Sequence, residues 1–207
     1  MENSSEKYIS RQKMGAVQQK LPSADRIRIA ARELFATNGF HQTSMAELAA
    51  AADMSVGLIY RSFKSKADII EAIVRTDFDE KLLEIGALRR QLADGELTVL
   101  ETFRQLFLQV MDEGDEALSF DILAEGFRNE RVGQTIGEMC ERFRGYLREF
   151  ARAANARLDG EDLEGATELL LGCLFGLGHR SISRPNLDSA HIAEQSARMI
   201  VTAFRDM

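Results

Sequence analysis

The sequence has few of the residues that interrupt helices or build metal and disulfide frameworks. Its 207 residues include two prolines, two cysteines, three histidines and no tryptophan. So few prolines leave long stretches free to be helical, because proline removes a backbone donor and breaks helices. His41, His179 and His191 show no metal-ligand spacing, and no nucleophile, base and orienting group combine into a catalytic motif. We therefore expect no metal, no cofactor and no catalytic residue.

Long apolar runs are absent as well. None approaches the roughly 18 residues that a membrane-spanning helix needs, and the first twenty residues lack the apolar stretch of a signal peptide. The sequence therefore predicts a cytoplasmic protein with no membrane partner. There, Cys140 and Cys173 are expected to stay reduced and pack as small apolar side chains. A redox-sensing thiol is the alternative for Cys140, because Arg142 and Arg144 follow it closely.

Charge is unevenly distributed, although the whole chain is acidic with a formal net charge of −7. Residues 1–66 hold ten lysines and arginines against six acidic residues, whereas residues 67–207 hold sixteen against twenty-seven. Such asymmetry indicates one end that meets a polyanion and one that does not. The basic end is the candidate surface for nucleic acid.

Helical periodicity runs through the sequence, and no stretch alternates apolar and polar residues as a half-buried strand would. We expect an all-α protein of about nine helices. Three parts are predicted: a flexible basic arm at residues 1–22, a helix-turn-helix domain at residues 23–73 and a larger helical domain at residues 74–207. Arms of this kind contact a neighbouring DNA groove in some proteins and are more often disordered.

Two short helices joined by a brief turn are expected at about residues 44–62. Ser44 with Glu47 fits a capping box, in which each side chain satisfies a backbone N–H of the first turn. The pattern is interrupted at Asp53, and Ser55 can cap the second helix. Two short helices in this arrangement place a recognition helix in the major groove of DNA.

One face of the second short helix is suited to DNA. Val56 and Gly57 make the N-terminal end of this face small, so the backbone of the helix can approach the DNA closely. Tyr60 and Arg61 offer a hydroxyl and a guanidinium to phosphates or guanine edges, although packing in the core is the alternative for Tyr60. Two lysines suited to phosphates follow, Lys64 and Lys66, and simple solvation is the alternative for the first of them.

Several short motifs occur at the spacing of one known family: Leu34-Phe35, Asn38-Gly39-Phe40, Thr43-Ser44, Ile59-Tyr60 and Phe63-Lys64-Ser65-Lys66. Roughly residues 24–73, about a quarter of the chain, resemble the N-terminal domain of the TetR family. Val56 and Ser62 depart from the pattern, because relatives often have a basic residue and a histidine there. Which bases are read therefore stays open.

The resemblance implies a homodimer that binds double-stranded DNA. It places at the DNA Thr43, Ser44, Ser55, Val56, Gly57, Tyr60, Arg61 and Lys66, to which the residue pattern itself adds Lys64. It also implies that the C-terminal helices surround a small-molecule pocket and that the last two form the dimer interface.

Residues 74–207 hold nine of the twelve phenylalanines, which suits a largely apolar pocket. The candidate ligand-binding residues are Phe107, Met111, Phe127, Met139 and Phe143. The candidate interface residues are Leu169, Gly172, Phe175, Gly176, Ala193, Ala197, Ile200 and Phe204. A plain hydrophobic core is the alternative for the first set, and burial within the monomer for the second.

These patterns together predict a ligand-responsive bacterial transcription regulator. We expect a repressor that is released from a palindromic operator when a small molecule of unknown identity binds the C-terminal domain. A helical interaction protein that retains an unused helix-turn-helix is one alternative. An enzyme is the other, and the motifs support it least.

Overall fold

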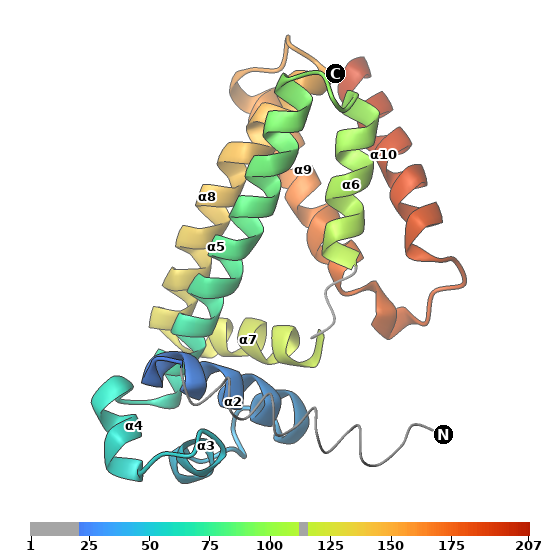
Figure 1. The fold of residues 1–207 in the computed structure, drawn as a ribbon. Coiled ribbons are helices and arrows are strands. Elements are labelled where there is room, and N and C mark those ends of the chain that lie inside the picture. Colours follow the sequence, from blue (N-terminus) through green and yellow to red (C-terminus); the bar gives the residue numbers. More distant parts are fainter. Residues whose placement is uncertain (1–20, 112–115) are drawn as a thin grey trace. The chain divides into compact units, whose positions relative to one another are not determined.

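The computed structural model describes residues 21–111 and 116–207. Within these ranges the chain forms nine α-helices and one short 3₁₀-helix, with no strand (Figure 1). The prediction of an all-α protein is confirmed. The predicted basic arm falls in residues 1–22, and its first twenty residues lie outside the described ranges. Among the described helices, none combines the length and apolar character that crossing a bilayer requires.

The chain divides into two compact units. Unit 1 holds the residues up to Val74 together with Ala117–Val132, and unit 2 holds Arg75–Glu116 together with Gly133–Met207. The division after Val74 lies beside the boundary expected from the sequence. The segment Ala117–Val132 differs from that expectation, because it belongs with the N-terminal residues rather than with the C-terminal helices.

Unit 1 is a small helical cluster in which α2 packs on α3 and α4, and α3 packs on α4. Ile27 of α2, Leu48 of α3 and Ile59 of α4 are fully buried and form its centre. Its helices are α2 (Ser23–Asn38), α3 (Met45–Ala51), α4 (Val56–Ser62), the start of α5 (Lys66–Ala93) and most of α7 (Glu116–Arg128).

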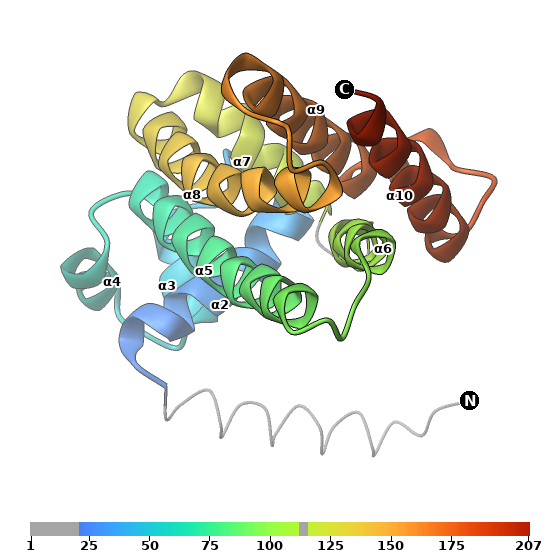
Figure 2. The same ribbon diagram turned by 90° about the horizontal axis from the view of Figure 1, so that it is seen from above.

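Unit 2 contains the rest of α5, most of α8 (Glu130–Ala154), and also α6 (Val99–Met111), α9 (Gly160–Gly178), the 3₁₀-helix η1 (Arg180–Ser183) and α10 (Ser189–Asp206). The helices α5 and α8 run side by side, and α6 packs against α9 and α10 (Figure 2). Phe103 of α6 lies at the centre of the core. Its ring is 6.4 Å from the rings of Phe107 and Phe150 and 6.0 Å from that of Phe204.

Candidate nucleic-acid interface

Local capping motifs position the two short helices. The Glu47 N–H donates to Ser44 Oγ at 3.2 Å, and the Ser44 N–H donates to the Glu47 carboxylate at 2.7 Å, which forms the expected capping box of α3. These bonds from Ser44 lower the pKa of the Glu47 carboxyl below its ordinary value. Ser55 caps α4 by accepting the Leu58 N–H at 3.3 Å. Because each helix has only seven residues, packing rather than helix propensity must maintain them.

The turn between α3 and α4 is held by Arg26 of α2. Its guanidinium donates to the backbone carbonyls of Ala52 at 2.5 Å and Asp53 at 2.9 Å. Asp53 has a φ of 53°, a left-handed conformation that is uncommon outside glycine. The bonds from Arg26 help to stabilise this turn. Nothing in the sequence distinguishes Arg26 from other basic residues, because its partners follow it by 26 and 27 positions.

The outer face of α4 is open to solvent, although Ile59 anchors the helix in the core. Val56 is 46% exposed and Tyr60 is 50% exposed. Gly57 and Arg61 are exposed as well, and a Cβ added at Gly57 would meet no atom within 4 Å. We call these four residues, Val56, Gly57, Tyr60 and Arg61, the recognition face. The expectation that they share one accessible surface agrees with the structure.

Three further candidate residues, Ser44, Ser55 and Lys64, are also exposed. Thr43 is not. It is 1% exposed, and its hydroxyl donates to the carbonyl of Gly39 at 3.0 Å. A buried hydroxyl with a bonded partner is not free to bind a phosphate, so the structure does not support the contact expected from the Thr43 side chain. Thr43 instead fastens the loop between α2 and α3.

Lys66 also binds the loop between α2 and α3. Its ammonium donates to the carbonyls of Phe40 at 2.5 Å and His41 at 3.1 Å, and lies 4.6 Å from the centre of the Phe40 ring. Partial burial lowers the pKa of Lys66, while the carboxylates of Glu125 and Glu47 act in the opposite direction. In the structure, Lys66 therefore fixes this loop, and the expected phosphate contact stays a prediction.

The helix α7 reaches the α2–α3 loop through two carboxylates one turn apart. Asp121 Oδ2 accepts the Phe40 N–H at 2.9 Å, and Glu125 Oε2 lies 3.8 Å from His41 Nε2. Glu125 is 8% exposed. These contacts account for the place of α7 in unit 1. The sequence contains no local sign of them, because Asp121 follows Phe40 by 81 residues.

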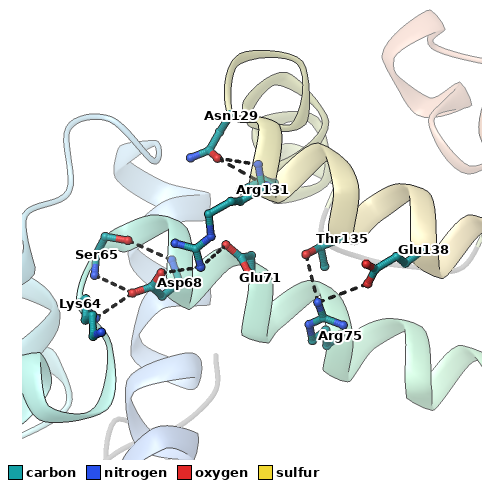
Figure 3. Close-up of polar contacts among 10 residues, drawn as sticks. Lys64, Ser65, Asp68, Glu71, Arg75, Asn129, Arg131, Thr135 and Glu138 are labelled. Carbon is teal, nitrogen blue, oxygen red and sulfur yellow. Dashed lines mark hydrogen bonds and ion pairs between the residues drawn. The ribbon is translucent and has the colours of Figure 1, made fainter.

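The chain that leaves α4 is held by Asp68 of α5 (Figure 3). Asp68 Oδ2 accepts the backbone N–H of Lys64 at 2.8 Å and of Ser65 at 3.0 Å, and Ser65 Oγ accepts the Asp68 N–H at 3.2 Å. Arg131 Nη2 lies 3.0 Å from Asp68 Oδ1. Burial alone raises the pKa of Asp68, but the bonds from Lys64, Arg131 and Ser65 outweigh it and lower the pKa overall.

Known proteins share both this helix-turn-helix and the helices that follow it. The family model for bacterial regulatory proteins of the tetR family matches residues 27–73. The solved structure of Salmonella enterica GusR is 30% identical, with 91% of this chain and 94% of GusR covered and a TM-score of 0.61. The chain belongs to the TetR family. The resemblance seen in the sequence is thereby confirmed.

Two further comparisons extend this result. The transcriptional regulator UidR of Escherichia coli K12 is 34% identical over 117 residues, which cover 56% of this chain and 57% of UidR. The chain therefore matches little more than half the length of this curated relative. FadR from Bacillus subtilis, solved in complex with stearoyl-CoA, is 19% identical, with 85% of this chain and 96% of FadR covered and a TM-score of 0.67. At that identity the likeness concerns the fold alone.

The five candidate ligand-binding residues of this TetR-family chain do not form one group. Phe107, Met139 and Phe143 are buried, and Met111 is half-buried against the core of unit 2. Phe127, in contrast, lies in unit 1 and is 93% exposed. An exposed ring cannot line an enclosed apolar pocket, so the structure does not support the expectation for Phe127. Helical spacing gave no means to separate it from the other four.

The candidate dimer interface is exposed on α9 but not on α10. Leu169 is 49% exposed and Phe175 38% exposed, and both Gly172 and Gly176 are exposed. The four candidates on α10 are at most 8% exposed, because the apolar stripe of this helix faces the core of its own protomer: Ala193, Ala197, Ile200 and Phe204. Burial within the protomer, the alternative for these four residues, is therefore what the structure supports, since buried side chains offer little surface to a second copy.

Neither cysteine has the low pKa of a reactive thiol. Burial raises the pKa of Cys140, although Arg144 acts in the opposite direction, and burial also raises the pKa of Cys173. Arg144 is itself paired with Glu168 at 2.7 Å. These environments favour the packing role for both thiols. Within the described ranges, no group of three or more His, Cys, Asp or Glu residues could hold a metal ion.

Proposed function

We propose that this TetR-family protein is a DNA-binding transcriptional regulator that contacts its operator through the recognition face. The observation that carries the proposal is the joint exposure of Val56, Gly57, Tyr60 and Arg61 on a helix held by a cap and by Arg26. A guanidinium suits guanine edges or phosphates, and an exposed valine suits a thymine methyl group. The basic surplus of residues 1–66 supports attraction to the DNA backbone in the bacterial cytoplasm.

A second copy of the chain completes the proposed DNA-binding form. Gly165, Gly172 and Gly176 of α9 are exposed, and a Cβ at each would meet no atom within 4 Å. Glycine inside a helix costs roughly 0.5–1 kcal/mol relative to alanine, a cost that close approach of another helix offsets. Leu169 and Phe175 flank this surface with exposed apolar area. We place the homodimer contact here, so that two recognition helices meet two half-sites of a palindromic operator.

Regulation is assigned to unit 2, where a small molecule releases the repressor from DNA. The same fold carries stearoyl-CoA in FadR. In this chain, unit 2 combines buried aromatic side chains such as Phe107 and Phe143 with Gln109, whose Oε1 is buried and has no hydrogen-bond partner among the described residues. An apolar site with few polar groups is typical for small ligands. Titration of candidate effectors against the operator complex tests the coupling, and an effector that binds without changing DNA affinity contradicts it.

The variants Arg61→Ala and Tyr60→Ala test the DNA-binding function. The operator is first identified by genomic footprinting of the wild-type protein on its host's DNA. Removal of the Arg61 guanidinium is then expected to raise the operator Kd about tenfold or more, measured by fluorescence anisotropy. Arg198→Ala, which removes an exposed arginine of α10 paired with Glu194, serves as the control and should bind as wild type. Unchanged binding by both recognition-face variants would favour the helical interaction protein instead.

A methyl group added at Gly57 is expected to have opposite effects on the free protein and on the DNA complex. Gly57→Ala should leave the fold as stable as wild type or up to about 1 kcal/mol more stable, because the site is open and alanine favours helix. The same methyl group stands where the DNA would approach, so the operator Kd should rise. Thermal melting by circular dichroism and anisotropy measure the two effects.

Gly137→Ala supplies the comparison for this variant, because Gly137 is also an exposed helical glycine with open space at its Cβ. It lies on α8, away from the recognition face in sequence, and should change stability without changing the operator Kd. A Gly57→Ala protein that binds the operator as tightly as wild type would show that the DNA does not approach this position closely.

A further inference from the structure

Arg131 is exposed, yet its guanidinium forms ion pairs with two carboxylates of unit 1. Its Nη2 lies 3.0 Å from Asp68 Oδ1 and 2.9 Å from Glu71 Oε1 (Figure 3). The two carboxylate side chains are only 19% and 16% exposed, whereas that of Arg131 is 64% exposed. Asp68 and Glu71 stand one helical turn apart on α5, where like charges repel each other. Arg131 is the cation that neutralises this pair.

Asp68 uses both of its oxygens. While Oδ1 faces Arg131, Oδ2 accepts the backbone N–H groups of Lys64 and Ser65. These two residues belong to the short connection between the end of α4 at Ser62 and the start of α5. A carboxylate fixed in this position therefore fixes the end of the helix that carries the recognition face.

Arg131 is itself held at the first turn of α8. Asn129 Oδ1 accepts the backbone N–H of Arg131 at 3.2 Å and lies 3.5 Å from that of Val132. Such a cap orders the first turn of a helix, and with it the base of the Arg131 side chain. A chain of contacts thus runs from the start of α8 through Asp68 to the residues that follow α4.

We propose that Arg131 is a positioning residue for DNA recognition: it holds the Asp68 carboxylate against the Lys64 and Ser65 N–H groups and thereby fixes the recognition helix without touching DNA. The inference rests on the proposed function. Without Arg131, the Asp68 and Glu71 carboxylates repel each other, and Asp68 turns away from the two N–H groups. The recognition helix then samples orientations that fit the operator poorly.

The test compares Arg131→Met with wild type on a fluorescein-labelled duplex that the wild-type protein enriches from a random-sequence library. We expect the Kd of Arg131→Met to rise about tenfold, the scale of removing a helix cap in each of two protomers. Amide hydrogen exchange at Lys64 and Ser65 should become faster. Because the residue makes no phosphate contact in this proposal, the slope of log K against log salt should not change.

Two further variants make the test specific. Arg131→Met combined with Glu71→Gln removes the repulsion that Arg131 neutralises, and it should restore the Kd to within about threefold of wild type. Arg75→Met removes another arginine that links α5 to α8, through Thr135 at 3.3 Å and Glu138 at 3.5 Å (Figure 3). Arg75 does not contact Asp68, so this variant should bind DNA as wild type.

Three results would overturn the inference. The first is a salt slope for Arg131→Met that is shallower than that of wild type by about one per protomer, which indicates that Arg131 binds a phosphate directly. The second is an unchanged Kd for a folded Arg131→Met protein, even if its melting temperature falls, because the residue is then only structural. The third is a weakened Kd that Glu71→Gln does not restore. If the wild-type protein enriches no duplex at all, the proposed function fails, and the inference fails with it.

Discussion

The double variant Leu169→Arg/Phe175→Arg is expected to be monomeric and to bind the operator about 10²–10⁴-fold more weakly than wild type, because a monomer lacks the avidity of two linked half-sites. Both side chains flank the exposed glycine surface of α9. Arginines there would bring like charges of two protomers together, which costs several kcal/mol in an interface. Sedimentation equilibrium gives the oligomeric state, and fluorescence anisotropy gives the operator Kd.

Leu83→Arg is the control for this experiment. Leu83 is 74% exposed on α5, so its replacement adds a charge to an exposed apolar position outside the proposed interface. This variant should remain dimeric and bind the operator normally. A Leu169→Arg/Phe175→Arg protein that stays dimeric would contradict the assignment of the interface to α9, and a monomer with full operator affinity would contradict the need for two linked half-sites.

Phe103→Ala is expected to lower the free energy of unfolding of unit 2 by about 3–5 kcal/mol, the range for truncating a fully buried phenylalanine. The ring is 0% exposed and contacts the rings of Phe107, Phe150 and Phe204. Its removal leaves a cavity that three facing rings cannot fill. Because the protein has no tryptophan, urea unfolding is best followed by far-UV circular dichroism.

Phe127→Ala makes the same chemical change at a ring that is 93% exposed. It should alter the free energy of unfolding by no more than about 0.5 kcal/mol, as surface substitutions usually do. Similar losses for Phe103→Ala and Phe127→Ala would contradict the burial on which the first prediction depends. A loss below about 1 kcal/mol for Phe103→Ala would show that unit 2 has no tightly packed aromatic centre.

The features that local sequence encodes could be predicted. The capping box of Ser44 and Glu47 and the cap at Ser55 depend on residues three positions apart, and both are present. The recognition face could be predicted for the same reason, since helical periodicity determines which side of a short helix lies opposite Ile59. Caps and helical periodicity predict helices but not what they bind, and the prediction of DNA binding came from the family motifs.

Long-range partners could not be predicted in this way. Arg26, Asp121 and Arg131 act on residues that lie 26 or more positions away along the chain. Thr43 shows a similar limit of sequence-based prediction. A small polar residue beside the start of a helix can bind either a phosphate or a buried carbonyl, and only the packing of the folded chain determines which partner it has. On α10 the apolar stripe was recognised, but periodicity does not say whether the same protomer or a second copy covers it.

The place of α7 in unit 1 limits how the DNA-binding domain of this protein can be exchanged for that of another. A chimaera that transfers only the residues up to Val74 would separate the Phe40 N–H from Asp121 and His41 from Glu125. The grafted domain would then lack two contacts that hold its α2–α3 loop. A graft that gives this protein a new DNA specificity therefore needs two segments, in which Ala117–Val132 is transferred together with the N-terminal helices. Modularity in this protein follows spatial contacts rather than the order of the chain.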